Sequence, residues 1–100
     1  MEMIPLCVPN LSGREAHYLQ ECVESTFVSS VGPFVTKFEE VIAESIEVKT
    51  VTAVSSGTTG LHLALMTLGV ERDDLVVLPS LTFIASANAI AHCGALPWLM

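Results

Sequence analysis

Ser56, Gly57 and Thr58 form a short run of small and hydroxylated residues between two stretches of different character. The stretch before the run, 51–54, is apolar and mostly β-branched like a strand, and the stretch after it, 58–68, has helical composition. The first turn of a helix has unpaired backbone N–H groups and the positive end of the helix dipole, so an anion such as phosphate fits there. The competing interpretation is that Ser56 or Thr58 only caps the helix.

A second loop ends in an aromatic residue, Phe83, after the apolar strand expected at 75–78. In open parallel sheets, ligands bind beyond the carboxyl ends of the strands, where both loops fall. If the two loops are neighbours, an anion site lies next to a flat ring that can stack on a planar heterocycle. Nucleotides and pyridoxal phosphate both combine these groups. The dinucleotide fingerprint G-x-G-x-x-G and the P-loop fingerprint G-x-x-x-x-G-K-[ST] are absent from the sequence.

The elements that must position these loops alternate between strand and helix, which predicts an α/β fold with a parallel sheet. Residues 1–13 are expected to form an extended arm, because prolines at 5 and 9 exclude a helix. Two helices are expected within 14–47, the first opened by Ser12 at capping-box spacing from Glu15 and the second following Gly32. Residues 50–100 are expected to begin an α/β core, with strand 51–54, helix 58–68, strand 75–78, helix 83–92 and strand 96–100. Phe34, Phe38, Val41 and Ile42 should form the buried side of the second helix.

The composition is very apolar for a chain of 100 residues, because 51% of them are hydrophobic and only 15% are charged. This composition suits the interior of a larger α/β protein better than a small domain with much surface, so the chain is expected to be part of a larger protein.

Charges and cysteines exclude several classes of function. The net charge is −7 and the four basic residues are scattered, so no basic patch is available for nucleic acid. The three cysteines lack C-x-x-C spacing, which argues against a disulfide framework and against a metal site. No secretory signal is visible, so a cytoplasmic protein is expected. Prolines, a glycine and polar residues interrupt the uncharged stretch 75–100, so no membrane span is expected.

Four ordered segments resemble successive motifs of the DegT/DnrJ/EryC1/StrS sugar aminotransferases. These segments are Val54-Ser55-Ser56-Gly57-Thr58, Leu61-His62-Leu63-Ala64-Leu65, the run from Pro79 through Ile90, and Gly94-Ala95-x-Pro97. Residues 4–13 and 28–32 are further similar to the branch that makes 4-amino-4,6-dideoxy sugar nucleotides for legionaminic acid or bacillosamine. The resemblance covers nearly the whole chain.

The resemblance implies the N-terminal part of the large domain of a fold-type I transferase that depends on pyridoxal 5′-phosphate (PLP). In that fold the first strand of this chain and the next two lie at opposite ends of the sheet, so the sheet expected here is incomplete and should expose apolar strand edges. Such enzymes pass an amino group, usually from glutamate, to the ketone of a nucleotide-linked 4-keto-6-deoxy sugar, and they work as homodimers. Carried over to this sequence, Gly57 and Thr58 would hold the cofactor phosphate with Ser56 nearby, and Phe83 would stack on the pyridine ring. Residues Val31 and Gly32 would lie near an active site shared across the dimer.

The sequence also departs from the family pattern. Thr59-Gly60 replaces two alanines, and glycine in the first turns of a helix costs about 1 kcal/mol relative to alanine. Asp73-Asp74-Leu75 replaces Gly-Asp-Glu, and Trp98 replaces valine.

The family's aspartate for the pyridinium nitrogen and its Schiff-base lysine are not found in the sequence, and neither Lys37 nor Lys49 is expected to take the lysine's role. The parent protein is therefore expected to be a transaminase, and this chain alone is expected to be inactive. Two alternatives remain, which are a small non-catalytic phosphate- or nucleotide-binding βαβ module and a truncated product without a function.

Overall fold

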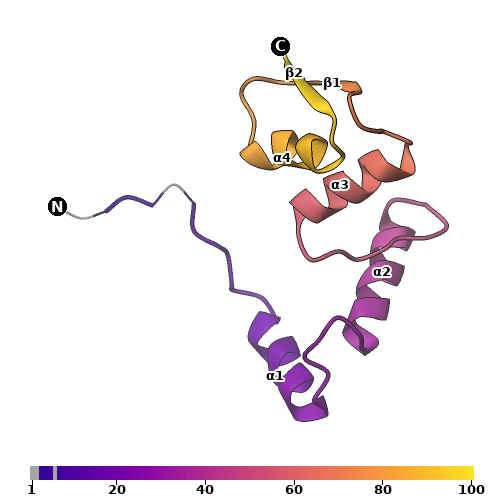
Figure 1. The fold of residues 1–100 in the computed structure, drawn as a ribbon. Coiled ribbons are helices and arrows are strands. Elements are labelled where there is room, and N and C mark those ends of the chain that lie inside the picture. The colour runs from indigo at the N-terminus through magenta and orange to yellow at the C-terminus, as the bar shows by residue number, and fades with distance from the viewer. Residues whose placement is uncertain (1–2, 6) are drawn as a thin grey trace. The chain divides into compact units, whose positions relative to one another are not determined.

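The computed structural model describes residues 3–5 and 7–100. Met1, Glu2 and Leu6, which belong to the arm expected at 1–13, lie outside the described residues. The elements, in order, are α1 (Glu15–Ser25), α2 (Pro33–Ser45), α3 (Gly57–Thr67), β1 (Leu75–Leu78), α4 (Ile84–His92) and β2 (Leu96–Leu99) (Figure 1). The chain divides into two compact units, 1–53 and 54–100, which are described separately.

Helix α1 begins without the side-chain cap predicted for Ser12. Its N-cap is Arg14, and no side chain accepts a hydrogen bond there. The Ser12 hydroxyl instead donates to Asn10 Oδ1 at 2.7 Å, and the Ser12 backbone N–H donates to the same oxygen at 3.1 Å. The capping-box prediction is wrong because Arg14 takes the N-cap position, so Ser12 lies two residues before it in a local turn with Asn10.

Helix α2 begins at a glycine that no other residue could replace without strain. Gly32 has φ 150°, and a Cβ there would lie 3.0 Å from the Cβ of Phe27. Pro33 follows at the first helical position, where its missing N–H has no cost. The Phe34 ring packs against Tyr18 of α1 at a centroid distance of 5.5 Å.

The buried side predicted for α2 is only partly buried in this unit. Phe34 and Ile42 are half-buried, whereas Phe38 and Val41 remain 56% and 53% exposed. The prediction is wrong for Phe38 and Val41, because within the unit 1–53 no other element covers that part of the helix.

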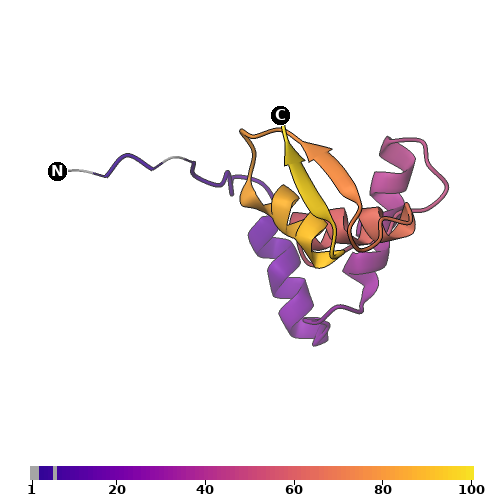
Figure 2. The same cartoon turned by 45° about the horizontal axis from the view of Figure 1, so that its top comes forward.

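In the second unit, α4 connects two parallel strands. Strands β1 and β2 pair in parallel with Leu75 opposite Leu96 and Leu78 opposite Leu99. Figure 2 shows the strands side by side, with α4 against one face of the pair and α3 packed beside α4. The core contains the side chains of Leu78, Ile90 and Ala95, and Leu65 of α3 packs against it.

The strand predicted at 51–54 is absent from the sheet, so the βαβαβ order becomes αβαβ. In the described residues the only strand pair is β1 with β2. The Ala53 N–H donates to the Glu39 carboxylate at 2.8 Å, so its acceptor is a side chain and not the backbone of a neighbouring strand. A strand forms only beside a partner, and among the described residues no backbone segment pairs with 51–54.

The ends of α3, β1, α4 and β2 each lie within one residue of the ends predicted from the sequence. The sheet is incomplete, as expected, and Leu75 and Val77 of β1 and Trp98 of β2 remain more than half exposed. In the part of the chain that the structure describes, no helix has both the length and the apolar character needed to cross a bilayer.

Candidate functional site

The N-terminus of α3 is capped by a side chain. Ser56 has extended backbone angles, and its Oγ accepts a hydrogen bond from the Thr59 N–H at 3.2 Å. The Ser56 and Thr59 hydroxyls also lie 3.0 Å apart. This confirms the capping interpretation for Ser56, and Thr58 is the second residue of the helix and not its cap.

The same first turn keeps two backbone donors available. The N–H groups of Gly57 and Thr58 have no acceptor within the helix, because the first turn contains no carbonyl that precedes them by four residues in helical geometry. Both groups lie at the positive end of the α3 dipole, where an anion is stabilised. The cap on Thr59 therefore does not compete with an anion at Gly57 and Thr58.

Gly57 has no steric reason within this chain to be glycine. A Cβ built at Gly57 would meet no atom within 4 Å, and its φ is not in the left-handed region. The space in front of this backbone is open, so a phosphate group can approach the two N–H donors closely.

The second loop presents Phe83 at the start of α4. Phe83 is the N-cap residue with φ −64° and ψ 142°, and its side chain is 86% exposed. Next to it, the Thr82 and Ser86 hydroxyls lie 3.2 Å apart. An aromatic ring this exposed is available for stacking.

The two loops line one open hollow of about 620 Å³. The hollow is lined by Gly57, Thr58, Gly60, Leu61, Thr82, Phe83, Ala85 and Ser86. The structure thus brings the predicted anion donors and the predicted stacking ring to one place. Of the predicted site residues, Ser56 shapes the rim as the cap of α3, whereas Gly57, Thr58 and Phe83 line the hollow itself.

Val31 and Gly32 belong to the other unit, 1–53, so their nearness to the hollow remains a prediction. Gly32 has a structural role there as the N-cap of α2.

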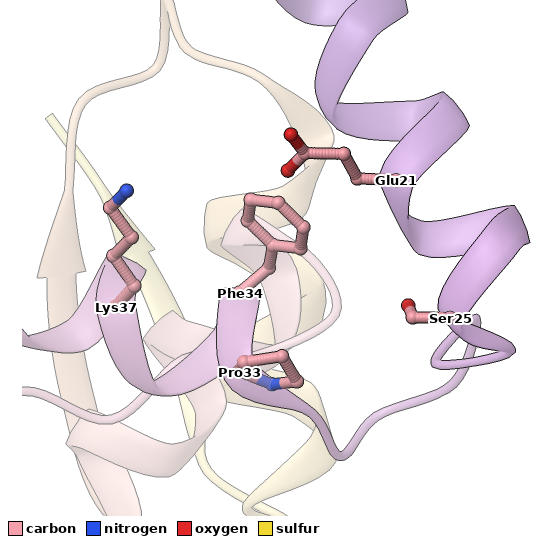
Figure 3. A pocket seen from close by; sticks show the side chains of 5 residues that line it. All are labelled: Glu21, Ser25, Pro33, Phe34 and Lys37. Carbon is pink, nitrogen blue, oxygen red and sulfur yellow. The ribbon is translucent and has the colours of Figure 1, made fainter.

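A pocket in the first unit was not predicted from the sequence. It measures about 320 Å³ and is lined by Glu21, Ser25, Pro33, Phe34 and Lys37 (Figure 3). Figure 3 shows the Phe34 ring between the side chains of Lys37 and Glu21. The sequence pattern predicts only that Phe34 lies on the buried side of a helix and that Glu21 and Lys37 lie on solvated helix faces. It does not indicate that these three residues share a pocket.

The comparisons with known proteins identify the family of the chain. The sequence model of the DegT/DnrJ/EryC1/StrS aminotransferase family matches residues 9–100. GDP-perosamine synthase from Escherichia coli O157:H7 is 48% identical over 97 residues, which cover 97% of this chain and 27% of that protein. The chain therefore spans about a quarter of the length of this relative.

Solved structures of aminotransferases share the fold. TlmJ from Streptoalloteichus hindustanus superposes with a TM-score of 0.82 at 39% identity, over 97% of this chain and 27% of that chain. NtdA from Bacillus subtilis, solved with the bound cofactor PMP, superposes with a TM-score of 0.75 at 32% identity, over 84% of this chain and 19% of that chain.

Proposed function

Because the chain belongs to the DegT/DnrJ/EryC1/StrS aminotransferase family, we propose that its parent protein aminates a nucleotide-linked 4-keto-6-deoxy sugar. Glutamate is the proposed amino donor, and the product would enter amino-sugar and surface-polysaccharide biosynthesis. The cofactor of the family is PLP. The observation that carries the proposal is the hollow in which two unpaired helix N–H donors and an exposed aromatic ring meet.

The proposed roles follow from the position of each residue. The N–H groups of Gly57 and Thr58 would bind the cofactor phosphate, and the Ser56 cap would hold the first turn in the geometry that aims them. Phe83 would cover one face of the pyridine ring and exclude water from it. When bound, PLP supplies the group that carries the amino nitrogen and the ring that withdraws electrons.

The chain offers no good candidate for the lysine that such chemistry requires. The Lys37 ammonium lies 6.0 Å from the centre of the Tyr18 ring in the first unit, and Lys49 follows α2. We expect the 100 residues to bind the cofactor without turnover, and the parent protein to supply the lysine. We also propose a cytoplasmic homodimer in which Val31 and Gly32 lie near the shared active site.

The name of one relative sets the order in which substrates should be tested. GDP-perosamine synthase is 48% identical to this chain, so GDP-linked 4-keto-6-deoxy sugars come first. UDP-linked sugars come second, because of the resemblance of residues 4–13 and 28–32 to the legionaminic acid and bacillosamine branch.

The test is a transamination assay with the protein that carries this chain. The purified protein is incubated with PLP, glutamate and either sugar nucleotide, and mass spectrometry follows conversion of the ketone to the amine. Formation of the amine together with 2-oxoglutarate would support the proposal. Binding of phosphate compounds without any amine product would favour the non-catalytic binding module instead.

A further inference from the structure

Two histidines from different helices lie close together in the second unit. His62 of α3 and His92 of α4 have ring centroids 5.5 Å apart, and their planes are inclined by 47°. His62 is half-buried and His92 is exposed. In the described chain no carboxylate pairs with either imidazole, whereas His17 in the other unit contacts Glu21 at 2.9 Å.

The spacing of the two rings matches the spacing that one shared metal ion imposes. An imidazole nitrogen binds Zn²⁺ at about 2.1 Å, which places the ion about 3.2 Å from the ring centre. Two rings bound to one ion at a tetrahedral angle then have centres roughly 5.2 Å apart. The observed distance of 5.5 Å between the ring centres is close to this value.

The electrostatic surroundings also favour a cation at this place. His92 lies in the last turn of α4, where the helix dipole presents its negative end. Among the described residues, no third histidine, cysteine, aspartate or glutamate completes a ligand set, so the remaining positions would be filled by water. Imidazole ligands suit Ni²⁺, Cu²⁺ and Zn²⁺ better than Mg²⁺ or Ca²⁺.

We propose that His62 and His92 form a two-imidazole site for a divalent transition-metal ion, which joins α3 to α4. The site is separate from the hollow, because His92 lies about 13 Å along α4 from Phe83, at the other end of the helix. An ion at this site would tie together the two helices whose N-termini form the hollow.

The experiment uses Ni²⁺ and the side-chain NMR signals of the three histidines in ¹⁵N-labelled protein at about pH 7.5, where most imidazoles are neutral. Ni²⁺ is paramagnetic and broadens the signals of the groups that bind it. We expect substoichiometric Ni²⁺ to broaden His62 and His92 while His17 stays sharp, and EDTA to restore all signals. Equal broadening of the three histidines, which an unfolded chain would also give, would overturn the proposal.

Variants test whether the two rings act together. His92→Gln removes one ligand at an exposed position, so it should weaken Ni²⁺ binding at least about tenfold, because the second imidazole binds intramolecularly once the first is engaged. His17→Gln is the matched control and should leave the affinity unchanged. An unchanged affinity in His92→Gln, or an equal loss in His17→Gln, would also overturn the proposal.

Discussion

Replacing Gly57 by alanine should weaken phosphate binding without lowering the stability of the fold. The new Cβ would meet no atom of the chain within 4 Å, and the backbone is not left-handed, so the folded structure has room for it. Alanine is favoured over glycine in a helix by up to about 1 kcal/mol. The free energy of unfolding should therefore stay the same or rise by up to about 1 kcal/mol.

The same methyl group should weaken a bound phosphate. Gly57 and Thr58 both line the hollow, so we expect a methyl group at residue 57 to crowd an anion held by their N–H donors. A hydrogen bond to a charged group contributes about 1.5–3 kcal/mol, so the loss of one such bond lowers affinity about 10- to 100-fold.

Isothermal titration with pyridoxamine 5′-phosphate measures this loss without requiring any lysine, and pyridoxamine without the phosphate is the matched ligand. The wild-type protein should prefer the phosphorylated compound, and Gly57→Ala should lose most of that preference.

Gly69→Ala is the control, because Gly69 has a left-handed backbone conformation and Gly57 does not. A Cβ at Gly69 would also meet nothing within 4 Å, but φ there is +80°. Alanine in this left-handed conformation should cost about 1–2 kcal/mol of stability and should not change the preference for the phosphorylated ligand. If Gly57→Ala binds pyridoxamine 5′-phosphate as tightly as the wild type, the phosphate does not lie at the N-terminus of α3 and the reasoning fails.

Three further substitutions test the site and the surface. Phe83→Ala should leave stability within about 0.5 kcal/mol, because the ring is 86% exposed, but should weaken pyridoxamine binding roughly 3- to 10-fold through lost stacking, and equal affinities would refute the stacking role. Ser56→Ala should cost about 1 kcal/mol in urea denaturation, because Thr59 loses its acceptor, and an unchanged midpoint would show that the cap is unimportant. Trp98→Lys should reduce self-association in sedimentation experiments, since Trp98 is 55% exposed on an uncovered strand, and an unchanged association constant would place the contact elsewhere.

Local signals in the sequence were sufficient for most helices, and the failures arise where structure depends on distant residues. The start of α3 was predicted from Ser56 and Gly57 because a cap acts within one turn. The segment 51–54 has strand composition, yet its ladder depends on a partner that this chain does not provide. Ser12 had the right spacing for a cap, but it forms a local turn with Asn10 and the helix begins two residues later than a cap at Ser12 requires.

The two loops of the candidate site could be located from the sequence, but their meeting could not. An open parallel sheet would place both loops beyond strand ends, yet the strand before α3 does not form, and the packing of α3 against α4 brings the loops to one hollow. The pair of His62 and His92 had no such signal. Their proximity depends on how α3 packs against α4, and the hydrophobic pattern within each helix does not specify which residues of the two helices meet.

The sequence offered two interpretations of Ser56-Gly57-Thr58, an anion site and a helix cap. They do not exclude each other, because they use different backbone N–H groups. The Ser56 side chain uses the N–H of Thr59, the third residue of the helix. The N–H groups of the first and second residues, Gly57 and Thr58, remain without an acceptor in the helix, and both residues line the hollow. The cap that Ser56 forms with the Thr59 N–H also holds the first turn of α3, and so fixes the direction of the N–H groups of Gly57 and Thr58. Capping at Ser56 therefore prepares the anion site, and the Ser56 hydroxyl does not need to contact the anion.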